Sequence, residues 1–377
     1  LTGGSLEVVA TGVDETFAET SAFAAAGLAG AGTVPSTRNT STTLAEIGNS
    51  NPARNIDLTQ NGTGSLTVSA DHTAITNTQV SSDAYGLLSG SGAEADNDVV
   101  ATVHARIGDD VVIDARDLTV NATNEVDKPS LSGGNIDATT GGLVSGADAD
   151  SETRLSLTTL VTIGDRVDLE VVGQPSDPGE FLLRAQNNIF ARDKVTLATG
   201  GAVSGAGADS DIRTLVDLAR VEIGEEADLT SVGEIDISAH GTGDVLIQAN
   251  AETYGLGTVA VGEATISLAP VNEVVVGAGS NVVAEGNVHI SAGTDTNFVR
   301  DEYSLEARMD TFAGSVIPIE NIDAEAFIVQ DNNITIEAGT LVESNQDVRI
   351  HAERLGLADA IARAKAVNWT TAVADGI

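Results

Sequence analysis

Residues 85–122 read YGLLSGSGAEADNDVVATVHARIGDDVVIDARDLTVNA, and most of the chain is a variation of this stretch. It begins with small residues, continues with acidic ones and ends in alternating apolar residues around the triplet IGD. A second copy, GGLVSGADADSETRLSLTTLVTIGDRVDLEVV, begins at Gly141, and a third, GGAVSGAGADSDIRTLVDLARVEIGEEADLTS, begins at Gly200. Self-similarity at a fixed period predicts an array of stacked repeats.

One glycine marks the period of the array. It follows an apolar residue in each copy, with separations of 60, 56, 60 and 53 residues between Gly48, Gly108, Gly164, Gly224 and Gly277. Residues 288–292 align with 348–352 at an offset of 60 and add a further copy. We therefore expect one continuous array over residues 1–377, with approximate repeats at 1–60, 61–122, 123–173, 174–239, 240–292 and 293–352 and a partial repeat at 353–377. Because the sequence begins and stops inside repeats, we expect it to be a section of a longer protein.

The composition suits narrow β-structure rather than a thick globular core. Aromatic residues are 3% of the chain, and the apolar 41% comes mainly from Ala, Val, Ile and Leu. Such side chains pack well on the pleated surface of a strand. The 40 glycines provide enough permissive positions for a turn at each corner of a repeat.

The charge and the missing cysteines exclude several classes of function. The chain carries 56 acidic and 18 basic residues, which gives a formal net charge of −38. This charge repels nucleic acids and anionic membrane surfaces and favours solubility and divalent cations, so we expect no nucleic-acid partner. No cysteine is present, which excludes disulfides, thiol catalysis and thiolate metal sites. No apolar run approaches the ~20 residues of a membrane helix, so we expect no membrane insertion.

Short alternating segments predict the strands. The pattern apolar-x-apolar-x-Ala recurs at 66–70, 118–122, 235–239, 245–249, 288–292 and 348–352. Alternation of this kind is typical of a half-buried strand. Tandem repeats of short strands leave three architectures: a solenoid, a propeller or an array of sandwiches. Propeller blades carry recurrent Trp/Asp signatures and sandwiches of ~100 residues usually have a core Trp, and neither feature recurs here.

We therefore predict an all-β fold: an elongated β-solenoid, like a parallel β-helix, built from tandem repeats of about 53–60 residues. Coils of roughly 20 residues, two or three per repeat, would stack near 4.8 Å apart into a rod on the order of 80–90 Å long. We interpret Arg354–Trp369, which is the one plausible helix, as a strand of a seventh copy instead. Residues 175–178 and Leu183–Asp193 predict an insertion.

The repeat pattern resembles that of a known family. The combination IGD-x-V-x-I-x-A with D-x-T-V-x-A, after a segment SGxGAxAD, is similar to the repeats of very large bacterial surface exoproteins of the filamentous-haemagglutinin-like and filamentous-adhesin type. The resemblance covers most of residues 60–352 and implies right-handed β-helical rods, secretion across an outer membrane, an extracellular or cell-surface location, and adhesion or fibre roles. The longer period and heavier acid content depart from that family and leave the shape of the cross-section open.

Carboxylates recur at two repeat positions. Alignment on the marker glycines places Glu94, Asp150, Asp209 and Glu263 at one position and Asp96, Glu152 and Asp211 two residues on. Alternate residues of a strand share a face, so each copy presents two carboxylates together. Ca²⁺ takes 6–8 oxygen ligands, which acid pairs and loop carbonyls can supply.

These acids have two interpretations. They form either a calcium site or a solvated, self-repelling face that keeps the protein soluble. Calcium is the one candidate cofactor, and the candidate metal ligands are Glu94, Asp96, Asp150, Glu152, Asp209 and Asp211. Asp109, Asp165 and Glu225, which follow the marker glycine, could add oxygens nearby.

The remaining chemistry-bearing residues form no recognisable site. No two of the five histidines have metal-ligand spacing, and we expect exposed strand histidines at His72, His104, His240, His289 and His351. Tyr85 and Tyr254 share a repeat position and are expected to be packing anchors at a corner. Acid–base catalysis needs a cleft that separates two pKa values, which a regular repeat does not favour, so we expect no enzyme.

The sequence thus predicts a non-enzymatic extracellular structural protein that self-associates into fibres or sheets, as a fibre, sheath or surface-layer element. An adhesin stalk that binds a host, surface or glycan is one alternative, and it would need an aromatic or cationic patch. A β-helical polysaccharide-active enzyme is another. It would need a carboxylate cluster that interrupts the repeat, and residues 175–193 are the place to look.

Overall fold

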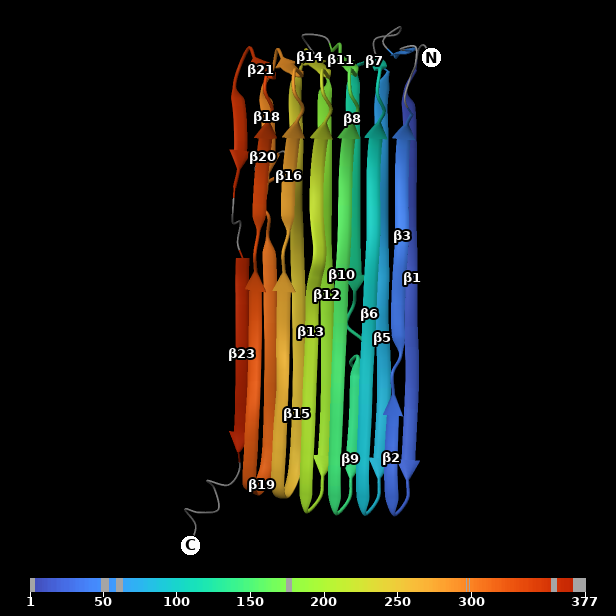
Figure 1. Cartoon of the computed structure of the whole chain (residues 1–377), viewed down its shortest axis with the longest axis vertical. Coiled ribbons are helices and arrows are strands. Elements are labelled where there is room, and N and C mark those ends of the chain that lie inside the picture. The colour runs from blue at the N-terminus through green and yellow to red at the C-terminus, as the bar shows by residue number, and fades with distance from the viewer. Residues whose placement is uncertain are drawn as a thin grey trace.

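The computed structural model describes residues 4–48, 54–58, 64–173, 178–295, 297, 299–353 and 358–368. All the secondary-structure elements in this part of the chain are β-strands, and neighbouring strands pair in parallel (Figure 1). The predicted all-β class is therefore confirmed. The segment interpreted as a strand rather than a helix forms β23 (Ala358–Asn368), while residues 354–357 and 369 lie outside the described residues.

The strands form two long layers and one short row. The first layer contains β1 (Leu6–Ala25), β5 (Ser65–Tyr85), β8 (Asp117–Lys128), β9 (Ile136–Gly141), β12 (Glu180–Gly200), the first part of β15 (Glu234–Leu268), β18 (Val288–Ala292), the first part of β19 (Tyr303–Ile328), β22 (Val348–Ala352) and β23. The second layer contains β2 (Leu28–Thr33), β3 (Ser36–Ile47), β6 (Leu88–Ile107), β10 (Val144–Ile163), β13 (Val203–Ile223), the last part of β15, β16 (Val271–Val276), the last part of β19 and β20 (Asp331–Ile336). The short row contains β4 (Arg54–Asp57), β7 (Val111–Ala115), β11 (Asp168–Val171), β14 (Asp228–Ser231), β17 (Asn281–Ala284) and β21 (Leu341–Ser344).

Adjacent strands in each layer come from successive repeats. One column of neighbours in the first layer runs through Leu6, Leu66, Leu118, Phe181, Ile235, Val288 and Val348. At the far end of the second layer the marker glycines are also neighbours. The Gly108 amide donates to the Ile47 carbonyl and the Gly164 amide to the Ile107 carbonyl, each at 2.8 Å. One step from strand to strand is therefore one whole repeat.

This register corrects the predicted coil size. The chain makes one circuit per repeat, along the first layer, back along the second and across the short row, instead of two or three coils of 20 residues. Strands of 20 residues such as β6 span about 66 Å, whereas seven strand levels at ~4.8 Å span only about 30 Å. The predicted rod of 80–90 Å along the stacking direction is wrong, and the long axis follows the strands (Figure 1).

The two layers enclose two apolar clusters. Inward positions alternate with outward ones along nearly every strand, as in β6 and β10. One cluster lies beside the short row and includes Leu66, Ile107 and Ile113; the other lies midway along the strands and includes Val99 and Leu155. Burial of these columns is the main source of stability, at about 25 cal/mol per Å² of apolar surface.

Buried polar side chains separate the two clusters. We call this group the polar seam, and it consists of His72, Asn124, Thr159, Asn187, Asp217, Asn272, Asp301 and Gln330. Several of its members are hydrogen-bonded to one another: Asn187 donates to Asp217 Oδ1 at 2.8 Å, and Asp301 Oδ2 accepts from Asn272 at 2.7 Å and from Gln330 at 2.8 Å. Buried polar groups without such partners would destabilise the fold.

The end opposite the short row is a narrow edge, because only small side chains lie between the layers there. The hydroxyls of Ser89, Ser145 and Ser204 each donate at 3.1 Å to a backbone carbonyl of the first layer. Two-residue turns then join the layers, as at Gly86-Leu87. A Cβ atom on Gly86 or Gly142 would overlap the backbone oxygen of the preceding circuit, so these turns require glycine.

The predicted insertion is right in one part and wrong in the other: eight residues, 172–179, separate β11 from β12, whereas two residues, 232 and 233, separate β14 from β15. Leu183–Asp193 belongs to the unbroken strand β12, which pairs with β8 at Phe181–Ala191 and with β9 at Val195–Gly200. A second insertion, which the sequence did not predict, is formed by residues 129–135, which separate β8 from β9. Residues 175–177 lie outside the described residues.

Candidate functional site

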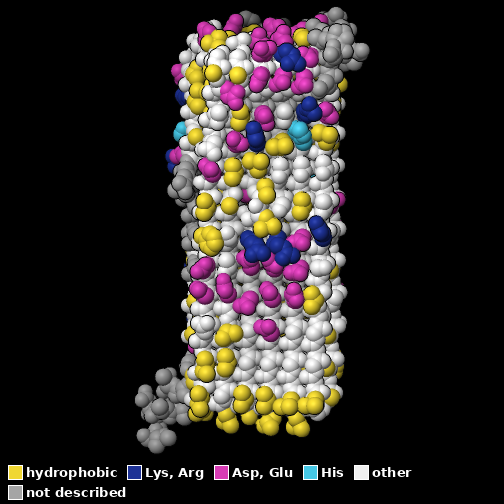
Figure 2. Space-filling model, in the orientation of Figure 1, with side chains coloured by type: hydrophobic (Ala, Val, Ile, Leu, Met, Phe, Trp, Pro, Cys, Tyr) yellow, Lys and Arg dark blue, Asp and Glu magenta, His cyan; other side chains and the backbone are white. Residues whose placement is uncertain are grey.

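The predicted acids lie on the outer face of the second layer in two adjacent columns. Glu94 on β6, Asp150 on β10, Asp209 on β13 and Glu263 on β15 are register neighbours. Asp96, Glu152 and Asp211 form the second column two residues further along the same strands. We call these the acidic columns, and they form the band of carboxylates across the middle of Figure 2. The sequence alignment therefore placed the candidate residues together.

Partial burial and, after it, the crowding of like charges raise the pKa values of three acids in the acidic columns. Partial burial, followed by the carboxylates of Asp209, Glu94, Glu152 and Asp96, raises the pKa of Asp150 to about 6. Partial burial also raises the pKa of Asp209 and of Asp211. Opposite charge would relieve this crowding, because a nearby cation favours the ionised carboxylate.

Arginines already supply part of that opposite charge. Arg154 Nε lies 2.5 Å from Asp98 Oδ1, and its Nη1 pairs with Glu152. Arg213 pairs with Glu152 and lies 3.2 Å from Asp211. A hollow of about 550 Å³ remains over the columns, lined by Asp150, Glu152, Asp209, Asp211, Arg213 and Glu263 among others.

The acids after the marker glycine do not join this group. Asp109 and Asp165 lie at the other end of β6 and β10, about 40 Å from the acidic columns at ~3.3 Å per residue. Their side chains accept backbone hydrogen bonds from the next circuit: Asp109 Oδ1 from the Asp165 amide at 3.1 Å, and Asp165 Oδ1 from the Glu225 amide at 2.9 Å. Their role is to cap turns, and the prediction that they lie near the columns is wrong.

A different group has the closest metal-like geometry in the described part of the chain. Glu234, Asp236 and His289 each offer one ligand atom, and these atoms all lie within 4.8 Å of one another. Asp236 and His289 are register neighbours on β15 and β18, and His289 Nδ1 lies 2.9 Å from Asp236 Oδ1. Burial raises the pKa of Asp236. Sequence reasoning missed this group because His289 is 53 residues from Asp236; a comparison of aligned repeat positions would have paired them.

The expectation of exposed histidines is wrong at two positions. His72 points inward within the polar seam, where its Nε2 lies 3.0 Å from Asp14 Oδ2. His240 is also buried, and this burial together with Arg184 lowers its pKa to about 4. His72 has the inward parity of Leu66 and Val68, whereas His240 has the outward parity and is buried nonetheless, because alternation along a strand gives the face of a residue but not what covers it.

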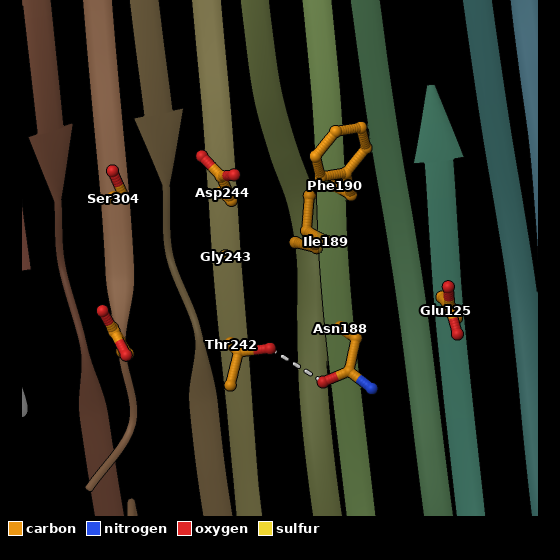
Figure 3. A pocket seen from close by; sticks show the side chains of 9 residues that line it. Glu125, Asn188, Ile189, Phe190, Thr242, Gly243, Asp244 and Ser304 are labelled. Atoms are coloured by element: carbon orange, nitrogen blue, oxygen red, sulfur yellow. Dashed lines mark hydrogen bonds between the residues drawn. The ribbon is translucent and has the colours of Figure 1, made fainter. Parts of the chain in front are cut away.

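Another hollow lies on the outer face of the first layer (Figure 3). It measures about 600 Å³ and is lined by Glu125, Asn188, Ile189, Phe190, Thr242, Gly243, Asp244, Glu302 and Ser304. Thr242 donates to Asn188 Oδ1 at 2.8 Å. The Arg192 guanidinium lies 4.3 Å from the centre of the Phe190 ring, so the one aromatic ring of this hollow already carries a stacked group.

Ionisable groups inside the protein were not foreseen from the sequence. Burial raises the pKa of Asp217 to about 6 and that of Asp301 to about 7. Lys128 and Asp193 form a fully buried ion pair at 3.0 Å between β8 and β12. Asp193 belongs to residues 175–193, the stretch in which a carboxylate cluster would have supported an enzyme. Its carboxylate pairs with Lys128 and accepts a hydrogen bond from the Ser210 hydroxyl at 2.7 Å.

No helix in the described residues is long and apolar enough to cross a membrane. Comparison of the chain with protein-family models, with curated proteins and with solved structures gave no match.

Proposed function

We propose that this chain is a β-solenoid and acts as a non-enzymatic extracellular structural protein, in a fibre, a sheath or a surface layer. The observation that carries the proposal is the continuous parallel register from Leu6 to Val348, with one repeat per circuit. Hydrogen bonds of every circuit run along the stacking direction, so the stack resists extension as a unit. The resemblance of the repeats to those of large surface exoproteins supports the extracellular location.

Both ends of the stack support assembly with further circuits. Among the described residues, β1 to β4 at one end and β20 to β23 at the other have partners on one side only. Apolar inward side chains remain partly exposed at these ends, including Val8 and Ala10 at the first and Ile322 and Ile328 at the last. Unpaired strand edges beside exposed apolar columns are surfaces on which another parallel strand can pair.

Sedimentation velocity over about two decades of concentration tests this proposal. We expect an open-ended series of assemblies. Ala10→Lys, which places a charge inward on the edge strand, should shorten the series because inward charges block edge pairing. Val9→Lys, outward on the same strand, is the matched control and should leave the series intact. A single monomeric species throughout would contradict the proposal.

A further inference from the structure

A ridge of exposed apolar side chains follows the narrow edge. Each circuit places one residue of the second layer's outer face directly after its two-residue turn, and these residues are Leu28, Leu88, Val144, Val203, Gly257 and Ile317. Leu28 is 74% exposed and Ile317 is 66% exposed. Exposed apolar side chains line the lower end of Figure 2, and the turn residues Leu87, Leu143, Leu256 and Val316 add to the ridge at this edge. Large apolar side chains repeated at a solvent-exposed turn have no role within the monomer, and such patches mark interaction sites.

A second column lies two residues further along the same face. It contains Gly30, Gly90, Gly146, Gly205, Val259 and Ile319. The four glycines are not required by the fold: a Cβ atom would meet nothing closer than 3.7 Å at Gly205, and nothing within 4 Å at Gly30. Together with the ridge they form an open trough of about 590 Å³ over the first three circuits.

Glycines at the same edge of the opposite face are different, because they are covered within the monomer. The Tyr85 ring lies over Gly141 and the Tyr254 ring over Gly314, where a Cβ atom would stand 3.1 and 3.3 Å from the rings. Both tyrosines also contact a phenylalanine, Phe23 at 6.1 Å and Phe312 at 5.4 Å between ring centroids. Tyr85 and Tyr254 thus pack at the corner as predicted. The glycines beside the ridge lack such a cover.

Large and small residues alternate between the two columns in a self-complementary way. In circuits one to four the ridge residue is Leu or Val and its neighbour two residues on is Gly. In circuit five the order is reversed, with Gly257 on the ridge and Val259 beside it. Each of these five circuits therefore contains one projection and one gap, whichever column holds which, whereas circuit six contains two projections, Ile317 and Ile319, and lies outside this complementary pattern.

We propose that this edge binds the same edge of a second copy of the chain across a two-fold axis that runs along the stacking direction between the two columns. With such an axis, the ridge residue of each circuit faces the partner residue of the same circuit that lies two positions after the partner's own ridge residue. Leu88 then packs on Gly90 of the other copy and Val144 on Gly146, while in circuit five Val259 fills the gap at Gly257. An isologous interface needs exactly such self-complementarity of one patch.

Charge and area favour a second copy as the occupant. Neither column contains a charged residue, although the chain carries a net charge of −38. The two-fold axis makes the bodies of the two copies extend in opposite directions, so the acidic columns do not face each other. An overlap of about 30 by 20 Å buries about 600 Å² per copy, which lies at the lower limit for a specific dimer and predicts a weak, closed one.

Exchange of the projection and the gap within one circuit is the sharpest test. Gly146→Val creates two projections and Val144→Gly two gaps, so we expect each to weaken the dimer about tenfold or more. The double variant Val144→Gly/Gly146→Val reproduces the arrangement of circuit five and should restore dimerisation. Sedimentation velocity of the full 377-residue chain gives the dimer constant. Thr158→Val, outward on β10 and away from both columns, is the control.

Two results would overturn the proposal. One is a dimer constant that is the same for the parent, Gly146→Val and the double variant. The other is flotation of the protein with neutral phosphatidylcholine vesicles that increases with Gly146→Val, since a lipid surface responds to added apolar area and not to complementarity.

This inference deepens the proposed structural role and adds a lateral contact to it. Ala10→Lys should remove end-to-end growth without affecting the dimer, so the two proposals can fail separately.

Discussion

At the scale of single residues, glycine has three separate roles in this chain, and the sequence does not distinguish them. At Gly142 the neighbouring circuit's backbone leaves no room for a side chain, at Gly141 a tyrosine ring covers the residue, and at Gly92 a Cβ atom would have open space. All three stand in similar Gly/Ala-rich contexts. Which role applies depends on the distance to the next circuit, which only the register determines.

Alanine substitution should separate these roles. Gly142→Ala forces overlap with the Gly86 carbonyl oxygen and should cost about 1–3 kcal/mol, as overpacking does. Gly92→Ala meets no atom within 4 Å and should be neutral or stabilising by about 0.5–1 kcal/mol, because alanine loses less backbone entropy on folding. Thermal unfolding followed by circular dichroism gives the comparison. Equal melting temperatures for the two variants would mean that the circuits are not packed this closely.

The buried acids predict that stability falls as the pH rises. Asp217 and Asp301 have folded pKa values of about 6 and 7, above the ordinary value of 3.8, so the folded state holds their protons more tightly than the unfolded state. Their stabilising contribution is complete below about pH 4 and is lost between pH 4 and 7, at about 1.4 kcal/mol per pH unit for each proton. Melting temperatures in matched ionic strength should therefore decline over this range.

Asp217→Asn provides the control for that decline. An asparagine can still accept the hydrogen bond from Asn187, but it binds no proton, and it removes a charge that adds to the effect of burial in raising the pKa of Asp301. The variant should show a flatter dependence on pH between 4 and 7. A profile as steep as that of the parent chain would assign the decline to other groups, such as Asp150 on the surface.

At the scale of strands, the alternation of apolar residues predicted strand positions well but not strand lengths. The patterns at 66–70 and 118–122 begin β5 and β8, and their apolar residues are buried. However, β5 continues through polar and small residues to Tyr85, because strands on both sides supply hydrogen-bond partners and override the weak propensity of such residues. The predicted coil size was wrong because periodicity locates strands but does not show which strands pair, and the pairing determines the length of a coil.

The buried ion pair of Lys128 and Asp193 should hold β8 and β12 together. Lys128→Met leaves the Asp193 carboxylate buried without its partner and should cost about 3–5 kcal/mol. Adding Asp193→Leu removes that charge and should recover a large part of the loss, although Ser210 then lacks its acceptor. A double-mutant cycle from urea unfolding measures the coupling. Additive losses from the two substitutions would show that the pair is not formed.

At the scale of the whole molecule, the alignment of repeats predicted which acids share a face, and the register reproduces the two columns. The function of the columns could not be predicted, because it depends on how closely opposing carboxylates approach and on arginines from a neighbouring position. Arg154 and Arg213 neutralise one side of the group, whereas Asp150 and Asp209 keep raised pKa values. Whether the columns are a calcium site or a solvated face therefore depends on Asp150 and Asp209, the acids that these arginines do not neutralise.

Calcium should raise the melting temperature more than an equal concentration of magnesium, at ionic strength held constant with NaCl. NaCl alone should stabilise the chain, because it screens the repulsion within a body of net charge −38. Ca²⁺ accepts the irregular oxygen geometry of stacked carboxylates better than Mg²⁺, and a ligand that binds only the folded state stabilises it by mass action. Asp150→Asn/Asp209→Asn should abolish the difference between the two ions, while Asp109→Asn, at the far end of the strands, should leave it unchanged. If the two ions have the same effect on the parent chain, the acidic columns serve solubility, and the stack is held by its ladders and apolar columns alone.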